Sequence, residues 1–115
     1  MDADQKMQRI DETLSHVWMV RTFLKHSEHA AEDQELQSVY RTLYDGMHAL
    51  GSAFQLGDGE AYLKQLKKKL PKMRSAADLF AEIQPEISTH TNFEMARRSL
   101  TAAMQEIQRW LDAVD

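Results

Sequence analysis

The chain has 115 residues, a length that suits one domain built around one hydrophobic core. It has no cysteine, which excludes disulfides, thiolate metal sites and cysteine nucleophiles, and its formal net charge of -4 argues against nucleic-acid binding. The longest apolar run, residues 17–20, is far too short to span a bilayer, and the N-terminus lacks the segments of a signal peptide. We therefore expect a cytoplasmic protein that contacts neither nucleic acid nor membrane.

The spacing of apolar residues predicts four helices, over about residues 3–27, 33–55, 59–83 and 92–113. The scarcity of turn-forming residues, with 4 glycines and 2 prolines, argues against a strand-rich fold. The first predicted helix has one wide apolar face, made of Met7, Ile10, Leu14, Val17, Val20 and Leu24. Because short connections make consecutive helices antiparallel neighbours, the predicted fold is an all-α, single-domain, up-down-up-down antiparallel four-helix bundle.

Three predicted helices begin at residues suited to cap them. Asp33 and Asp58 can each accept hydrogen bonds from the free backbone amides in the first turn of the helix that follows. Thr91 and Glu94 have the spacing of a capping box, in which each side chain binds the other residue's backbone amide. These residues predict the starts of the second, third and fourth helices.

The third predicted helix contains a proline and precedes another. Pro71 has no N–H and its ring crowds the preceding turn, so we expect a kink or break near residues 67–71. Pro85 predicts the end of this helix. Its expected core face consists of Leu63, Leu66, Leu70, Met73, Ala77 and Phe80.

Histidines gather at one predicted end of the bundle. In an up-down-up-down bundle the first and third connections lie at the same end, which places His26 and His29 near His90. Imidazoles and nearby carboxylates can together bind zinc or another divalent ion, so these histidines are a candidate metal site. The alternative is that polar residues gather at solvated loop ends, because neither HExxH nor Glu-x-x-His occurs.

Residues 48–57, HALGSAFQLG, resemble the active-site segment of histidine-containing phosphotransfer domains, which are also small four-helix bundles. The resemblance implies His48 as the phospho-accepting imidazole and Gly51 as the small residue that gives access to it. The lysine of that motif is missing after Leu50, so Gly51 is displaced by about 100° around the helix. The alternative is a helix that ends in small residues, with His48 on its polar flank.

The first predicted helix also has apolar residues on its outer side. Met19 and Phe23 are four residues apart and point away from the core face, and Trp18 lies at the edge of that face. Methionine and aromatic residues are enriched in the cores of protein interfaces, so this surface predicts a homodimer or partner contact. The alternative is that the helix is buried over a wider arc.

Charged residues raise two further questions. Arg21 projects into the apolar face of the first helix, where an unpaired charge is costly, so we expect a buried polar residue held in an ion pair. Asp45 and Asp78 are possible partners, and the alternatives are that Arg21 extends outward to solvent or marks a polar site in the bundle. A cluster of basic residues on the third helix could attract phosphate groups or an acidic partner, or form a solvated face. That cluster consists of Lys64, Lys67, Lys68, Lys69, Lys72 and Arg74.

Residues 16–26 (HVWMVRTFLKH) and 90–93 (HTNF) resemble small uncharacterised all-helical proteins of planctomycete-type bacteria, a group that implies a bacterial protein but no activity. The chain has no P-loop, Rossmann glycine pattern, nucleophile elbow or triad-like grouping. We therefore expect a non-enzymatic helical bundle that acts through protein–protein interaction or self-association as a homodimer. A metal-binding bundle is the first alternative, and a degenerate phosphotransfer-like domain is the second.

Overall fold

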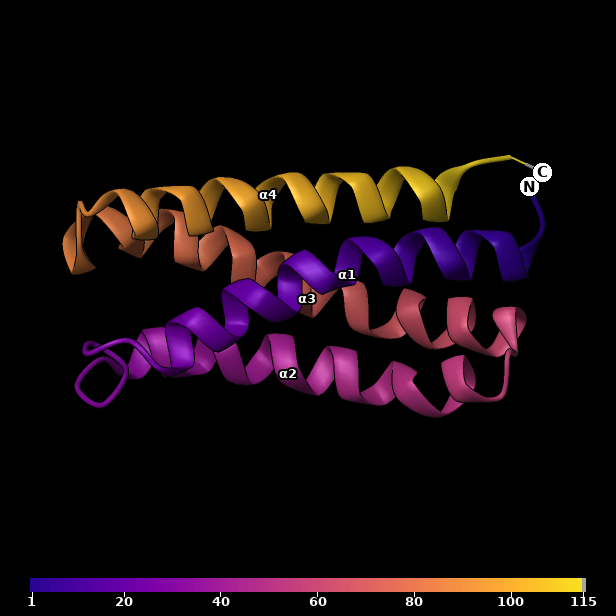
Figure 1. Cartoon of the computed structure of the whole chain (residues 1–115), viewed down its shortest axis with the longest axis horizontal. Coiled ribbons are helices and arrows are strands. Elements are labelled where there is room, and N and C mark those ends of the chain that lie inside the picture. Colours follow the sequence, from indigo (N-terminus) through magenta and orange to yellow (C-terminus); the bar gives the residue numbers. More distant parts are fainter. Residues whose placement is uncertain (115) are drawn as a thin grey trace.

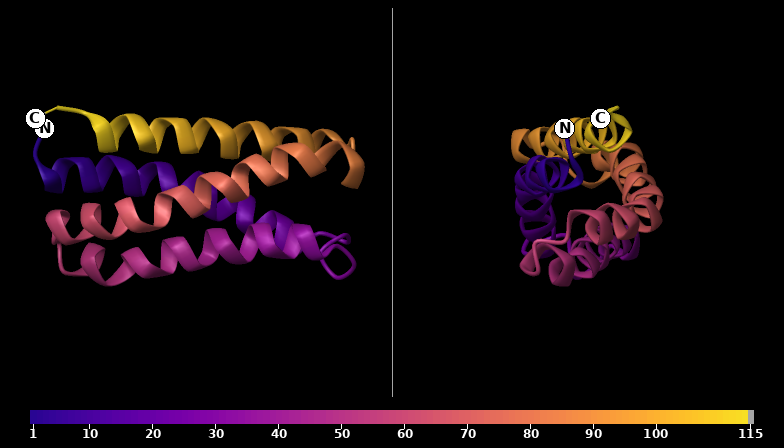
Figure 2. Two further views of the ribbon diagram at one scale, coloured as in Figure 1. Left: turned by 180° about the vertical axis from the view of Figure 1, so that it is seen from behind. Right: turned by 90° about the vertical axis from the view of Figure 1, so that its right-hand side faces the viewer.

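The computed structural model describes residues 1–114 and contains four helices: α1 (Ala3–Lys25), α2 (Gln34–Gln55), α3 (Gly59–Ile87) and α4 (Thr91–Asp112). Consecutive helices run in opposite directions, and the beginning of α1 and the end of α4 lie at the same end of the molecule (Figure 1). Each helix packs against its neighbours in sequence, and α1 also packs against α4 and α3. The end-on view in Figure 2 shows the four helices around a common centre. The predicted all-α four-helix bundle is confirmed.

All four helices contribute to the core. The six residues of the predicted apolar face of α1 are all buried, as expected from their spacing. Each large apolar side chain that is fully buried stabilises the fold by about 1.5–3 kcal/mol. The largest are Tyr62, Phe80, Met7, Ile10, Leu24, Leu36, Leu43, Leu50, Leu66, Leu70, Met73 and Leu100. No helix within residues 1–114 has the length and apolar character needed to cross a membrane.

The predicted caps of α2 and α3 are confirmed. Asp33 Oδ1 accepts a hydrogen bond from the Leu36 amide at 2.9 Å, and Asp58 Oδ1 accepts one from the Ala61 amide at 3.1 Å. Between these caps, α2 ends at Gln55 with Leu56 as its C-cap, and the next residue, Gly57, has a φ of 67°, in the left-handed region that favours glycine. The Asp58 amide there bonds to the Ala53 carbonyl at 2.9 Å, which closes the helix end and turns the chain directly into α3.

The start of α4 differs from the predicted capping box of Thr91 and Glu94. His90 is the N-cap, because its Nδ1 accepts a hydrogen bond from the Asn92 amide at 3.0 Å. The His90 carbonyl already accepts the Glu94 amide at 3.1 Å, so Thr91 is the first residue inside the helix. Serine, threonine, aspartate and asparagine dominate the N-cap position, so the sequence pattern favours Thr91 over His90 there.

The prolines do not end or break α3, which is continuous from Gly59 to Ile87. Pro71 and Pro85 are both exposed, so water can bond the carbonyls that lack an amide partner. The predictions of a break near residues 67–71 and of an end at Pro85 are therefore wrong, whereas a kink at Pro71 stays a prediction. The buried side chain of Gln84 stabilises the last turn of α3, because its Nε2 donates a hydrogen bond to the Ser88 carbonyl at 2.8 Å.

The first turns of α3 also differ in register from the predicted core face. Tyr62 is fully buried, whereas Leu63, which was expected in the core, is only partly buried. The Tyr62 ring packs near the Phe54 ring, with 6.3 Å between centroids, and its hydroxyl donates to Asp11 Oδ1 at 3.2 Å. Tyr62 therefore joins the beginning of α3 to both α1 and α2.

Candidate functional site

The outer side of α1 has two large exposed apolar side chains next to each other. Trp18 is 43% exposed and Met19 is 65% exposed. Phe23 differs from the prediction, because it is partly buried and its ring packs edge-on against Phe93 with 5.0 Å between centroids. The α4 helix covers this side of α1, so Phe23 supports the fold while Trp18 and Met19 form an exposed ridge.

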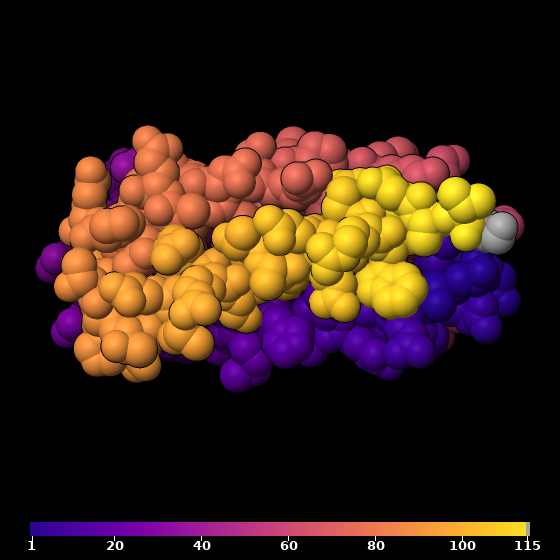
Figure 3. Space-filling view, turned by 90° about the horizontal axis from the view of Figure 1, so that it is seen from above, coloured from indigo at the N-terminus to yellow at the C-terminus, as the bar shows by residue number. Residues whose placement is uncertain are grey.

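A groove without acidic residues, lysine or arginine runs along this ridge between α1 and α4. It has a volume of about 340 Å³, and its wall on α4 includes Met95, which is 52% exposed. Figure 3 shows the face over α4, with α1 along one side of it. We call this surface the α1–α4 groove, and its lining residues are His16, Met19, Val20, Phe23, Asn92, Met95, Ala96 and Ser99. None of them is aspartate, glutamate, lysine or arginine, although 28% of the chain is charged.

A second groove lies on the other side of the ridge, between α1 and α2. It has a volume of about 320 Å³ and is lined by Asp11, Leu14, Ser15, Trp18, Tyr44, Met47 and His48. Three rings follow one another along its wall: the Trp18 and Tyr44 centroids are 6.1 Å apart, and His48 stacks on Tyr44 at 5.7 Å. The ridge of α1 is therefore flanked by apolar or aromatic surface on both sides.

Arg21 does not form the predicted ion pair. Its guanidinium carbon lies 4.8 Å from the Trp18 ring centroid and 4.7 Å from the Tyr44 ring centroid, in a double cation–π contact. The side chain is partly buried, and within residues 1–114 it has no hydrogen bond or salt bridge to Asp45, Asp78 or another carboxylate. The aromatic faces replace the expected carboxylate because Tyr44 comes from α2 at the level of Arg21.

Asp11 lines the second groove and lies beside the hydroxyl of the buried Tyr62. Burial raises the pKa of the Asp11 carboxyl above its usual 3.8, and the hydrogen bond from Tyr62 partly offsets this rise. Burial and the neighbouring carboxylate together raise the pKa of the Tyr62 phenol, which therefore stays protonated and donates the hydrogen bond. Asp11 is thus a partly desolvated acid whose carboxylate accepts a hydrogen bond from the Tyr62 hydroxyl.

Replacing Asp11 by asparagine should raise the free energy of unfolding at pH 7. A carboxyl whose pKa is raised by folding contributes stability that is fully present below pH 3.8 and is lost as the pH rises through its folded-state pKa. The asparagine keeps an acceptor for Tyr62 without the desolvated charge. Urea denaturation at several pH values should show the gap between variant and wild type narrowing toward pH 3.8; a gap independent of pH would contradict this assignment.

The three histidines of the predicted metal site lie at one end of the bundle, near the connections before α2 and α4 (Figure 1). His29 packs edge-on against Phe93 at 5.5 Å and lies 3.6 Å from the Glu28 carboxylate, whereas His90 caps α4 and His26 is exposed. Within residues 1–114, no group of three or more histidine, aspartate or glutamate side chains is placed to hold a metal ion. Metal binding at this pole stays a prediction.

His48, the predicted phospho-acceptor, is exposed in the α2 half of the second groove. Its ring is stacked on Tyr44 with an interplanar angle of 13°. Apart from its chain neighbours and the backbone of its own helix, no atom lies within 4 Å of the place a Gly51 Cβ would occupy, so Gly51 makes no close approach that requires a glycine. Phosphotransfer at His48 stays a prediction.

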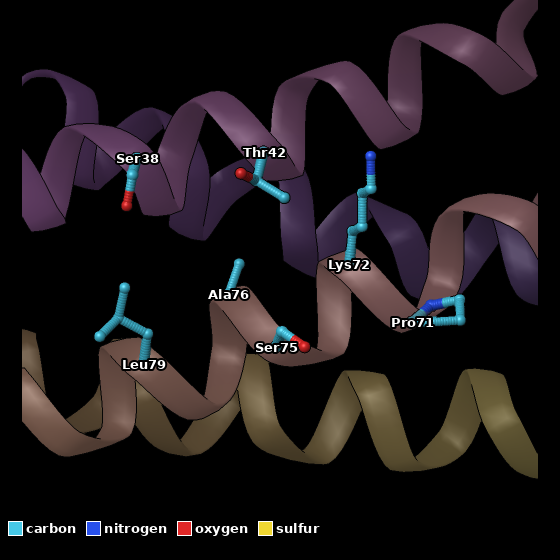
Figure 4. Close-up of a pocket in the computed structure, with 7 residues that line it drawn as sticks. All are labelled: Ser38, Thr42, Pro71, Lys72, Ser75, Ala76 and Leu79. Carbon is cyan, nitrogen blue, oxygen red and sulfur yellow. The ribbon is translucent and has the colours of Figure 1, made fainter.

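Two other surface features, a hollow between α2 and α3 and the basic cluster on α3, lack the groups expected of a catalytic site. A hollow of about 390 Å³ between α2 and α3 is lined by Ser38, Thr42, Pro71, Lys72, Ser75, Ala76 and Leu79 (Figure 4). These residues include hydroxyl groups but no carboxylate or imidazole that could activate one. The basic residues of the predicted cluster on α3 are exposed except for the partly buried Lys69, as expected for a solvated face.

The fold defines the class of this protein as an all-α antiparallel four-helix bundle. Comparison with protein-family models, curated proteins and solved structures finds no match to the chain.

Proposed function

We propose that this protein is a non-enzymatic interaction protein that self-associates through the α1–α4 groove and the Trp18–Met19 ridge beside it. The observation that carries the proposal is a groove with two exposed methionines, Met19 and Met95, and without acidic residues, lysine or arginine, in a chain with 28% charged residues. Interface cores are depleted in charged residues and enriched in methionine and aromatic residues. Methionine also adapts its shape to an apolar surface that enters the groove.

The shape of this surface favours a second copy as the partner. A ridge and a groove lie next to each other on the same helix, so two α1 helices related by a twofold axis can each place the ridge in the other copy's groove. Such an isologous contact buries Met19 of both copies in identical surroundings. Trp18 extends the contact toward α2 and supplies a large aromatic surface, which is common at energetic centres of interfaces.

Placing a carboxylate in this groove should strongly weaken self-association. Met19→Asp and, separately, Met95→Asp should each weaken the dimer roughly hundredfold, because an unpaired buried charge opposes association. Leu56→Asp is the matched control, since Leu56 is 82% exposed but lies at the turn between α2 and α3. Sedimentation of the variants, with circular dichroism to confirm folding, measures the effect; equal association of all three variants and the wild type would refute the proposal.

The variants avoid Phe23 for a structural reason. An aspartate at position 23 would face Phe93 in the partly buried contact between α1 and α4, and would therefore destabilise the monomer as well as the dimer. Met19 and Met95 are more than half exposed, so their replacement tests association separately from folding.

A further inference from the structure

A third groove between α1 and α2 has a concentration of positive charge. It has a volume of about 430 Å³ and is lined by Arg21, Lys25, Tyr40, Arg41, Tyr44 and Asp45, and we call it the basic groove. Three cations and one carboxylate leave a local charge of 3 - 1 = +2 in a chain whose formal net charge is -4. Within the described part of the chain, none of the three cations forms an ion pair.

Arg21 is held in place on this groove by aromatic contacts. Trp18 and Tyr44 lie 4.8 and 4.7 Å from its guanidinium carbon, and the buried Nε has no hydrogen-bond partner. The two terminal nitrogens are not buried and bond to no atom of residues 1–114, so they are available to a ligand in the groove. A guanidinium already fixed in position loses little conformational freedom when it binds an anion.

We propose that the basic groove binds a phosphate group, with the guanidinium of Arg21 as its fixed donor and Arg41 and Lys25 completing the charge. A phosphate monoester carries about -1.5 to -2 charges at pH 7, which matches the local +2 better than a single carboxylate does. Planar guanidinium groups donate paired hydrogen bonds to phosphate oxygens. The partly buried Tyr40 and exposed Tyr44 offer ring surface to an organic group attached to that phosphate.

Asp45 is part of the groove and opposes the anion. It stands four residues after Arg41 on α2, on the same side of the helix, and its carboxylate lowers the positive charge available to a ligand. Its replacement by asparagine should therefore strengthen phosphate binding, whereas loss of a cation should weaken it. A general loss of structure on mutation would weaken phosphate binding in every variant, so these opposite changes in affinity distinguish a specific site from that effect.

The test is a titration followed by the two indole N–H resonances in ¹H–¹⁵N spectra at constant ionic strength. Inorganic phosphate and phenyl phosphate should each shift the Trp18 resonance saturably, whereas the resonance of Trp110, on α4, is the internal control. Tighter binding of phenyl phosphate would assign the site to organic monoesters, and equal binding would assign it to free phosphate. The absence of a saturable Trp18 shift, or acetate binding as tightly as phosphate, would overturn the proposal.

Four variants make the same test specific. Arg21→Gln should weaken phosphate binding by at least about tenfold and Arg41→Gln by about three- to tenfold, since each removes charge-assisted hydrogen bonds. Asp45→Asn should tighten it, and Arg109→Gln, a change of an exposed arginine in the last turn of α4, should leave it unchanged. If Arg21→Gln does not fold, Arg41→Gln and Asp45→Asn decide the outcome; unchanged affinity in both would overturn the proposal.

Discussion

Replacing Tyr62 by alanine should lower the free energy of unfolding by about 3–5 kcal/mol, the range for removing a large aromatic side chain from a core. Tyr62 is fully buried, and its ring and hydroxyl connect α3 to Phe54 of α2 and to Asp11 of α1. The substitution leaves a cavity between three helices and removes the only donor found for the Asp11 carboxylate in residues 1–114. Urea denaturation followed by circular dichroism measures the loss.

Leu63 is the matched control for this substitution, because it is the adjacent residue and is only partly buried. Leu63→Ala should cost about 1 kcal/mol, as less apolar area leaves the core. Tyr62→Phe, which keeps the ring, should cost about 1 kcal/mol through the lost hydrogen bond. A larger cost for Leu63→Ala than for Tyr62→Ala would contradict the register of α3 described above.

Replacing Gly59 by alanine should lower the free energy of unfolding by about 1–3 kcal/mol, through overpacking where α3 begins against α1. A Cβ at Gly59 would lie 2.6 Å from the Ala3 carbonyl carbon and 2.6 Å from the Asp4 amide nitrogen. Both are backbone atoms, so the start of α1 would have to move. The movement would also strain the hydrogen bond from the Gly59 amide to Asp4 Oδ1, now 2.9 Å.

Gly51→Ala is the control for Gly59→Ala, and it should raise the free energy of unfolding instead of lowering it. Gly51 lies within α2 and is exposed, and apart from its chain neighbours and its own helix backbone no atom lies within 4 Å of an added Cβ. Alanine is favoured over glycine inside a helix by up to about 1 kcal/mol, so this variant should unfold at higher urea concentration than the wild type. Destabilisation by both substitutions to the same extent would show that close approach to α1 is not what Gly59 provides.

The sequence pattern predicted the architecture because most buried positions repeat with the period of a helix. The apolar face of α1, the caps Asp33 and Asp58, and the order of four antiparallel helices all follow from local spacing. Local rules failed where solvent exposure or tertiary contact decided the outcome. Pro85 lies inside α3 on its exposed side, and buried Gln84 holds the turn that follows it.

The candidate sites were less predictable, because they depend on which residues of other helices come close. Periodicity placed Trp18 and Met19 outside the core, but it did not show that α4 covers Phe23. The expectation of an ion pair for Arg21 followed from charge alone, whereas the contact with Tyr44 depends on the alignment of α1 and α2. The signal in the sequence was Tyr44, an aromatic residue near the middle of α2. The spacing of residues within one helix cannot show which residue of another helix, here Arg21 of α1, lies beside it.

Asp11 and Tyr62 were missed for a related reason. Asp11 is one of 18 acidic residues in the chain, and nothing in its local sequence distinguishes it from the others. Its raised pKa results from burial beside α3, 51 residues further along the chain. A long-range contact of this kind is a property of the folded bundle rather than of any short motif.

The most direct test of self-association through α1 is the mass of the wild-type protein in solution. Sedimentation equilibrium over a range of concentrations from micromolar upward should show a weight-average mass that rises from 13.3 kDa toward twice that value. A mass that stays at 13.3 kDa at every concentration would contradict the proposed dimer and leave the Trp18–Met19 ridge without its predicted partner.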